Sequence, residues 1–96
     1  MMLLTKSNRK SLPAMRSTEH DSDPVVQVKF FDPTGSFTWY ATEFDGEDQF
    51  FGYVDSGRGG ELGYFSLREL SSHRGRFGLG IERDRHFSPR PLSEVR

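Results

Sequence analysis

Four carboxylates lie within six consecutive residues of the chain. On a hairpin, Glu43 and Asp48 would lie nearly opposite each other, with Asp45 and Glu47 at the tip. Oxygen ligands this close could hold Mg²⁺ or Ca²⁺. The spacing matches no calcium-binding loop, however, and Gly46 suits a tight turn by itself. We therefore favour a solvated tip that discourages edge-to-edge aggregation. A local acidic patch that attracts a basic partner is the alternative.

A second cluster of ionisable residues occurs in the segment IERDRHF near the C-terminus. If this segment is extended, Glu82, Asp84 and His86 share one side. Such a trio could bind a divalent metal or act as acid and base. Arg83 and Arg85 would share the other side and could bind a phosphate or a carboxylate through paired N–H groups. We favour an arm held to the sheet by salt bridges, each of which contributes little.

Aromatic side chains are candidates for stacking a base or meeting a partner. The rings considered for such a role are those of Trp39, Tyr40, Tyr53 and Tyr64. Rings of this kind normally lie among Lys and Arg when they bind nucleic acid, whereas the hairpin offers mainly acids. Core packing explains most of them, because 33% of residues are hydrophobic and 14% are aromatic. A nucleotide site would need Arg58, Arg83 and Arg85 to hold the phosphate.

The sequence predicts no catalytic residues and no cofactor. Cysteine is absent, which excludes a thiolate nucleophile, a disulfide framework and a Cys-ligated zinc site. Ser66 is assigned to a helix cap, and Ser71, Ser72 and His73 are neighbours that cannot face one another on a helix. No phosphate loop, dinucleotide fingerprint or hydrolase motif occurs. A metal-dependent enzyme using Glu82, Asp84 and His86 is therefore only a second alternative.

These side chains would be positioned by an α+β fold in one small domain over 1–96. We expect an antiparallel sheet of about four strands, a capped helix after the last strand and a short N-terminal helix. The signals are a Thr5 cap, β-branched and aromatic runs, the Asp45–Gly46 turn and a capping box beginning at Ser66. The expected elements are a helix over 5–12, a loop over 14–24, strands over 25–31, 37–44, 49–54 and 61–65, a helix from 66 with an exit at Gly75, and an extended arm over 74–96.

Alternation along the hairpin makes both faces of the sheet apolar near its middle. One face would carry Tyr40, Thr42, Phe44, Phe51 and Tyr53. The other would carry Phe37, Trp39, Ala41, Glu43, Phe50, Gly52 and Val54. Such a sheet needs cover on both sides, from the helices, from the arm anchored by Ile81, Phe87 and Leu92, or from a partner. Homo-oligomerisation is therefore plausible, and we expect a ring to fold over the bare backbone of Gly52.

The net charge and the N-terminal segment bear on the kind of partner and on the cellular location that we expect. A net charge of −1 gives no bulk field to recruit nucleic acid or a membrane, so direct nucleic-acid binding is not expected. The start MMLLTKSNRK has too few apolar residues for a signal peptide or a membrane span. We expect a cytoplasmic protein.

Several segments together carry a family likeness: LLTK at 3–6, VKFFDP at 28–33, TWYATEFDGED at 38–48, FFGYV at 50–54, ELGYFSLREL at 61–70 and GLGIERD at 78–84. The chain resembles a family of small bacterial proteins of unknown function that are carried on plasmids, conjugative elements and phages. The resemblance implies one compact domain, no established activity and no catalytic residues to transfer. It leads us to expect a non-enzymatic binding protein that occludes or sequesters a host protein, such as one of a defence system. A nucleotide-sequestering protein is the alternative.

Overall fold

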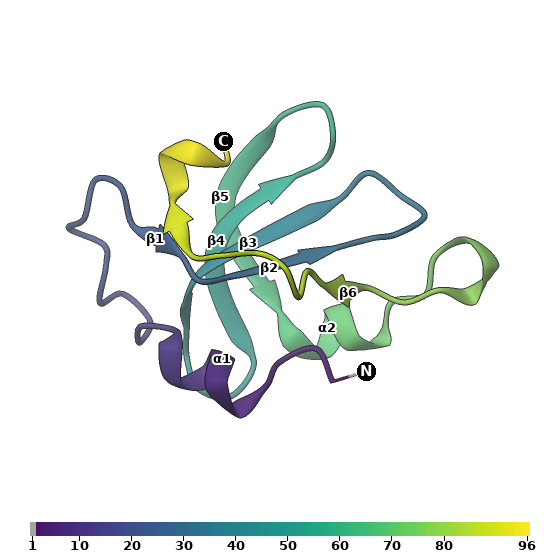
Figure 1. Ribbon diagram of the computed structural model, residues 1–96, viewed down its shortest axis with the longest axis horizontal. Coiled ribbons are helices and arrows are strands. Elements are labelled where there is room, and N and C mark those ends of the chain that lie inside the picture. The colour runs from purple at the N-terminus through teal and green to yellow at the C-terminus, as the bar shows by residue number, and fades with distance from the viewer. Residues whose placement is uncertain (1) are drawn as a thin grey trace.

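The computed structural model describes residues 2–96 (Figure 1). A five-stranded antiparallel sheet has the order β5-β4-β3-β2-β6, and a second sheet pairs β1 with β7. The elements in chain order are α1 (Lys6–Ser11), β1 (Val25–Val26), β2 (Val28–Phe31), β3 (Thr38–Phe44), β4 (Gln49–Asp55), β5 (Gly60–Ser66), α2 (Leu67–Ser72), the 3₁₀ turn η1 (Arg76–Gly78), β6 (Glu82–Arg83), β7 (Arg90–Pro91) and the 3₁₀ turn η2 (Leu92–Glu94).

The α+β class is confirmed, but three details of the prediction are wrong. The main sheet has five strands because β6 adds to the outer edge of β2. For the same reason α2 does not follow the last strand but lies between β5 and β6. The expected strand over 25–31 is divided at Gln27, so that β1 pairs with the C-terminal β7 while β2 pairs with β3. In both β6 and β7, this pairing provides hydrogen-bond partners for the backbone groups of the C-terminal segment.

Both helices begin where their caps predict. The Thr5 hydroxyl accepts from the Asn8 N–H at 3.0 Å, and the Asn8 side chain accepts from the Thr5 N–H at 3.0 Å, which forms a capping box. The Ser66 hydroxyl accepts from the Glu69 N–H at 3.1 Å at the start of α2, but the Glu69 side chain does not return a bond to the Ser66 N–H, so the predicted capping box is only half formed. Gly75 does not form the helix exit, because α2 already ends in an extended cap at His73.

A β-bulge in β3 decides which side chains reach which face. Ala41 lies opposite Gly52, but Glu43 lies opposite Phe51, so Thr42 is the extra residue. The bulge moves Glu43 to the face of Phe51 and moves Phe44 to the opposite face, where it stacks on Phe50. The predicted faces are therefore wrong for Glu43 and Phe44, because strict alternation does not anticipate an inserted residue.

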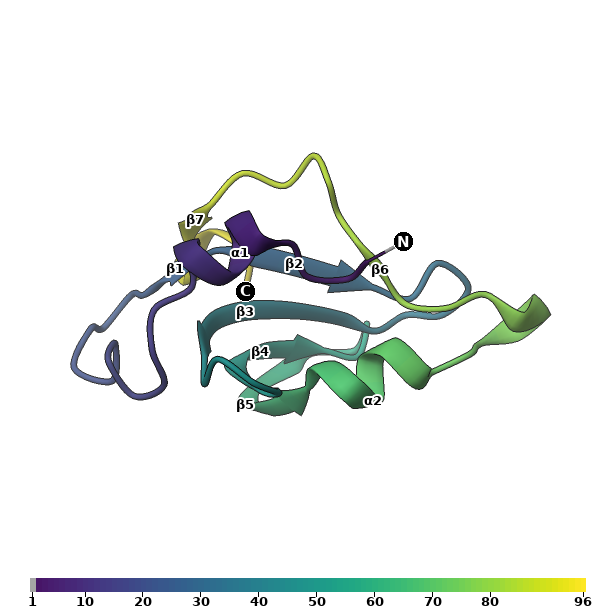
Figure 2. The same cartoon turned by 90° about the horizontal axis from the view of Figure 1, so that it is seen from below.

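Two apolar clusters cover the two faces of the sheet. The larger one lies on the side of Phe30, Phe50 and Phe65, with Leu70 of α2 and the leucines that flank α1. The smaller one joins Val26, Tyr53 and Leu92, and Phe87 packs against it. Figure 2 shows the C-terminal segment passing over the sheet on the side opposite α2. The C-terminal segment thus supplies part of the cover that the doubly apolar hairpin requires.

Candidate functional site

Asp45 closes the hairpin tip through one oxygen of its carboxylate, Oδ1. Its carboxylate accepts from the N–H groups of Glu47, Asp48 and Gln49 at 2.8, 2.8 and 3.1 Å. These bonds, that of Glu47 foremost, lower the pKa of Asp45 below its ordinary value. The Asp45 N–H donates to the Gln49 carbonyl at 2.9 Å, so the connection is a four-residue loop rather than the two-residue turn. Glu47 is exposed at this tip.

Asp48 ties the hairpin tip to the start of α2. Its carboxylate accepts from the Ser66 hydroxyl at 2.7 Å and from the Arg68 N–H at 2.8 Å. The bond from Ser66, followed by that from Arg68, lowers the pKa of Asp48. The Asp48 carbonyl also accepts from the Leu67 N–H at 2.8 Å. Asp48 therefore positions a helix.

Glu43 is buried, with 3% of its surface exposed, and anchors the loop over 14–24. Its carboxylate accepts from the N–H groups of Arg16 and Thr18 at 2.7 and 3.0 Å, and from the Thr18 hydroxyl. Burial alone would raise the pKa of Glu43, but these three hydrogen bonds outweigh burial and lower it. A carboxylate saturated in this way holds the loop against the sheet.

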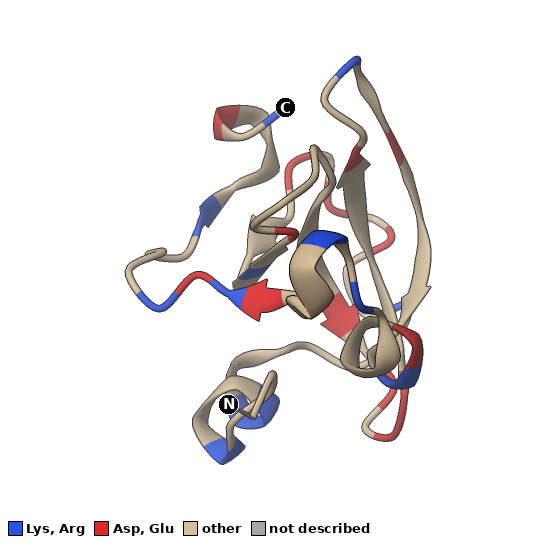
Figure 3. Ribbon diagram, turned by 90° about the vertical axis from the view of Figure 1, so that its right-hand side faces the viewer, with Lys and Arg blue, Asp and Glu red and all other residues tan. Residues whose placement is uncertain are grey.

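The acidic residues of the hairpin therefore point to separate places. Within residues 2–96, no group of three or more His, Asp and Glu side chains is arranged to hold a metal ion. Figure 3 shows acidic and basic residues on several separate parts of the ribbon.

The segment from Glu82 to Phe87 is not extended throughout, contrary to the sequence-based expectation. Strand β6 ends at Arg83, and the chain then turns: the Phe87 N–H donates to the Asp84 carbonyl at 3.3 Å. The Asp84 carboxylate accepts from the His86 N–H at 3.0 Å, an Asx turn that redirects the backbone. Because of this turn, Glu82, Asp84 and His86 do not converge on one side.

Of the three arginines proposed for phosphate, Arg83 and Arg85 line one hollow beside α1, whereas Arg58 lines another. Arg83 donates to the carbonyls of Met2 and Leu3 at 2.7 and 2.9 Å and so holds the N-terminal segment to β6. Arg58 lies in the turn between β4 and β5, and Arg85 lies in the turn after β6. A phosphate site built from all three is not assembled.

The four candidate rings also separate. Trp39 stacks on Phe37 at 5.7 Å on the face of the larger cluster. Tyr53 is buried in the smaller cluster, and Tyr40 packs against it. Tyr64 of β5 is 63% exposed and meets Phe51 edge-on at 5.0 Å. Among these rings, Tyr64 is the one that the structure leaves widely open.

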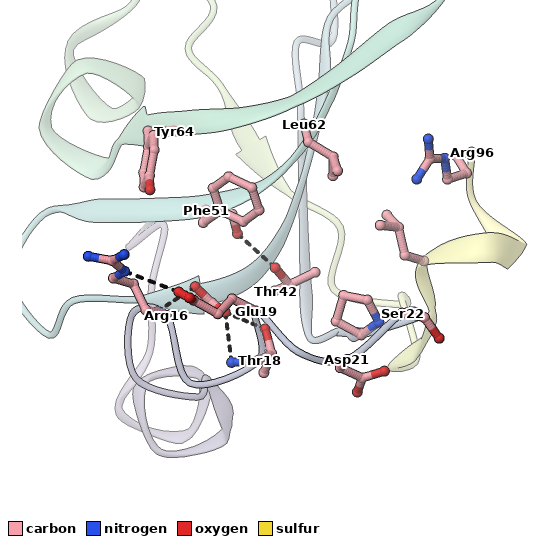
Figure 4. A pocket seen from close by; sticks show the side chains of 13 residues that line it. Arg16, Thr18, Glu19, Asp21, Ser22, Thr42, Phe51, Leu62, Tyr64 and Arg96 are labelled. Atoms are coloured by element: carbon pink, nitrogen blue, oxygen red, sulfur yellow. Dashed lines mark hydrogen bonds and ion pairs between the residues drawn. The ribbon is translucent and has the colours of Figure 1, made fainter.

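Tyr64 borders a hollow of about 260 Å³ between the loop over 14–24, η2 and the outer face of β4 and β5. Its apolar wall is formed by Phe51, Leu62 and Tyr64, which we call the apolar strip (Figure 4). Leu62 is 47% exposed. Arg16 lies at the rim, where its guanidinium pairs with Glu19 at 3.1 Å. A hollow with an apolar wall and a mixed charged rim can contact another molecule without any bond-breaking group.

Sequence reasoning named Tyr64 but missed Phe51 and Leu62 as surface residues. A signal for Leu62 was present, because Leu62 and Tyr64 are alternate residues of one predicted strand and share a face. The loop over 14–24 gave no such signal: its position depends on Glu43, which the bulge redirects.

The structure is a small α+β domain with a hollow that is lined in part by apolar side chains. The chain belongs to the family described as "Protein of unknown function (DUF2958)", which matches residues 3–95. Neither a curated protein nor a solved structure gives a significant match to the chain. Across residues 2–96, every helix is too short or too polar to cross a bilayer.

Proposed function

We propose that this chain is a non-enzymatic binding protein that contacts another protein through the apolar strip and the adjoining hollow. In the setting that the sequence resemblance implies, a mobile genetic element or a phage, the partner is a host protein that the chain occludes or sequesters. A component of a defence system is the partner that this setting favours.

The exposure of Leu62 and Tyr64 carries the proposal. Two large apolar side chains on one sheet face, beside a third at Phe51, form a contiguous patch of the kind that marks interaction sites. The other face of the same strand is buried at Phe65, so the exposure is confined to one side. The charged rim at Arg16 and Glu19 matches the polar rim that surrounds protein interfaces.

The alternatives have less support from the same geometry. The alternative of an enzyme is weakened because the carboxylates of Glu43, Asp45 and Asp48 already accept hydrogen bonds from backbone and hydroxyl donors. They are therefore poor candidates for acid–base catalysis. A nucleotide site has less support, because Arg58 lies apart from Arg83 and Arg85 and the Arg83 Nη1 already donates to two backbone carbonyls. A protein partner needs neither a metal nor a phosphate site.

Affinity capture with matched variants tests the proposal. We expect the double variant Leu62→Glu and Tyr64→Glu to lose a partner that the wild-type chain retains. Phe77→Glu is the control, because Phe77 is 87% exposed but lies in η1, remote in sequence from the strip. Circular dichroism should show that both variants are folded. Retention of the partner by the double variant, or its loss in the control, would contradict the proposed surface.

A further inference from the structure

The outer strand β5 is an unprotected edge of the main sheet. It is seven residues long and ends the strand order on its side, whereas β6 at the opposite edge has two residues, both charged. Strand β5 contains neither proline, lysine nor arginine, and its pairing with β4 has no bulge. Glu61 is its single charge. Edges of this kind are normally blunted or covered, because they pair readily with another strand.

The hydrogen bonds at the two ends of the β4–β5 hairpin fix which backbone groups face outward. The Ser56 N–H donates to the Gly59 carbonyl at 3.0 Å, and the Leu67 N–H donates to the Asp48 carbonyl at 2.8 Å. In an antiparallel ladder, hydrogen-bonded pairs recur at every second residue. Odd-numbered residues of β5 therefore bond to β4. The N–H and C=O groups of Gly60, Leu62 and Tyr64 point away from the sheet.

Helix α2 leaves this edge open. It begins at Leu67 and returns across the face of the larger cluster through Leu70. The residue that caps its end, His73, lies within 3.6 Å of Asp32, beyond β2. Figure 1 shows α2 at the end of β5 instead of along its length. No backbone hydrogen bond within residues 2–96, apart from those of the strand itself, involves Gly60, Leu62 or Tyr64.

The sequence of β5 is complementary to itself in antiparallel register. With a two-fold axis through Gly63, Leu62 lies opposite Tyr64 of the second copy, and Tyr64 opposite its Leu62. Aromatic and aliphatic side chains in directly opposed positions stabilise such pairs. Glu61 lies opposite Phe65 of the second copy, so the two Glu61 residues are about 13 Å apart along the strand. No like charges face each other in this register.

We propose that two copies of the chain associate by antiparallel pairing of β5 about Gly63, which joins the two main sheets into one. The interface is isologous: the backbone groups of Leu62 bond to those of Tyr64 in the second copy, and the two-fold axis repeats the same bonds with the copies exchanged. A second copy fits this edge better than an unrelated strand, because both the apolar pairs and the charge separation follow from β5 alone. The apolar strips of the two copies then adjoin on one face and remain open to a further partner.

A charge exchange at Gly63 tests the pairing without reference to any partner. A Cβ at Gly63 would meet no atom within 4 Å, so the monomer accepts a side chain there. By sedimentation velocity, the wild-type chain should have twice the monomer mass. Gly63→Glu and Gly63→Lys should each be monomeric, because like charges face each other across the axis. Their mixture should regain the dimer.

A monomeric wild-type chain at high concentration would overturn the proposal. So would a dimer unaffected by either substitution, or a mixture of the two variants that remains monomeric. Amide hydrogen exchange adds an independent readout: the N–H groups of Leu62 and Tyr64 should be protected in the wild type and exchange rapidly in Gly63→Glu. Unchanged exchange at both amides would also contradict the pairing. Because no partner takes part, these outcomes do not depend on the proposed function.

Discussion

Gly52 and Gly63 lie opposite each other in the β4–β5 ladder, but the space around them differs completely. A Cβ on Gly52 would come within 1.8 Å of the Tyr40 carbonyl oxygen, whereas a Cβ on Gly63 would meet nothing within 4 Å. The crowding at Gly52 comes from the adjacent β3 backbone, next to the bulge. It is thus a carbonyl group, and not a ring as predicted, that requires glycine there.

Gly52→Ala should destabilise the fold by about 3 kcal/mol or more, because the β3 backbone must move to admit the methyl group. Gly63→Ala is the matched control and should change the free energy of unfolding by less than about 0.5 kcal/mol. Urea denaturation of both variants measures the difference. Equal destabilisation would show that the bulged strand does not approach Gly52 as described.

Glu43→Gln should lower the free energy of unfolding by about 2 kcal/mol, because an amide cannot accept all three hydrogen bonds from Arg16 and Thr18. Limited proteolysis should then cut the loop over 14–24 sooner than in the wild type. Glu19→Gln removes an exposed ion pair with Arg16 and should change stability by about 0.5 kcal/mol or less. If the two substitutions changed the free energy of unfolding equally, Glu43 would not be the residue that anchors the loop.

The protein should lose stability as the solution becomes acidic. The pKa of Glu43 is lowered in the folded state, so the unfolded chain binds more protons at low pH. The stabilisation is complete above the ordinary carboxyl pKa, roughly 4, and disappears as the pH falls through the lower folded value. Asp45 and Asp48 act in the same direction. Urea midpoints between pH 7 and pH 3 should decline less steeply for Glu43→Gln than for the wild type. An equal decline would contradict this account of Glu43.

Ser66→Ala should cost about 1 to 2 kcal/mol, because it removes the acceptor for the Glu69 N–H at the start of α2. It also removes the donor to the Asp48 carboxylate. Ser72→Ala at the other end of α2 is the control: its exposed hydroxyl donates to the Glu69 carbonyl, and its loss should cost less than about 0.5 kcal/mol. Thermal unfolding followed by circular dichroism distinguishes the two, and a neutral Ser66→Ala would contradict the cap.

Local signals predicted those elements that local interactions determine. Thr5 and Ser66 cap helices, and the turn around Gly46 separates β3 from β4, because each of these features depends on residues within a few positions of one another. Strands β6 and β7 escaped prediction, since two residues carry no alternating pattern and pair only with strands remote in sequence.

The bulge at Thr42 shows why the candidate site was harder to predict than the fold. One inserted residue turns Glu43 from a surface acid at the hairpin tip into the buried anchor of a distant loop. No local pattern in TWYATEF marks that insertion. The strand carrying Leu62 and Tyr64 was predicted, but its free edge follows from the strand order of the whole sheet.

The footprint of a captured partner tests the central claim most directly. Nuclear magnetic resonance chemical-shift mapping on the isotopically labelled chain, with and without the partner, would locate the contact residue by residue. We expect the largest changes at Phe51, Leu62 and Tyr64, with smaller ones around Arg16. Changes centred on Glu82–His86 or on the Asp45–Asp48 loop, with the apolar strip unaffected, would contradict the account.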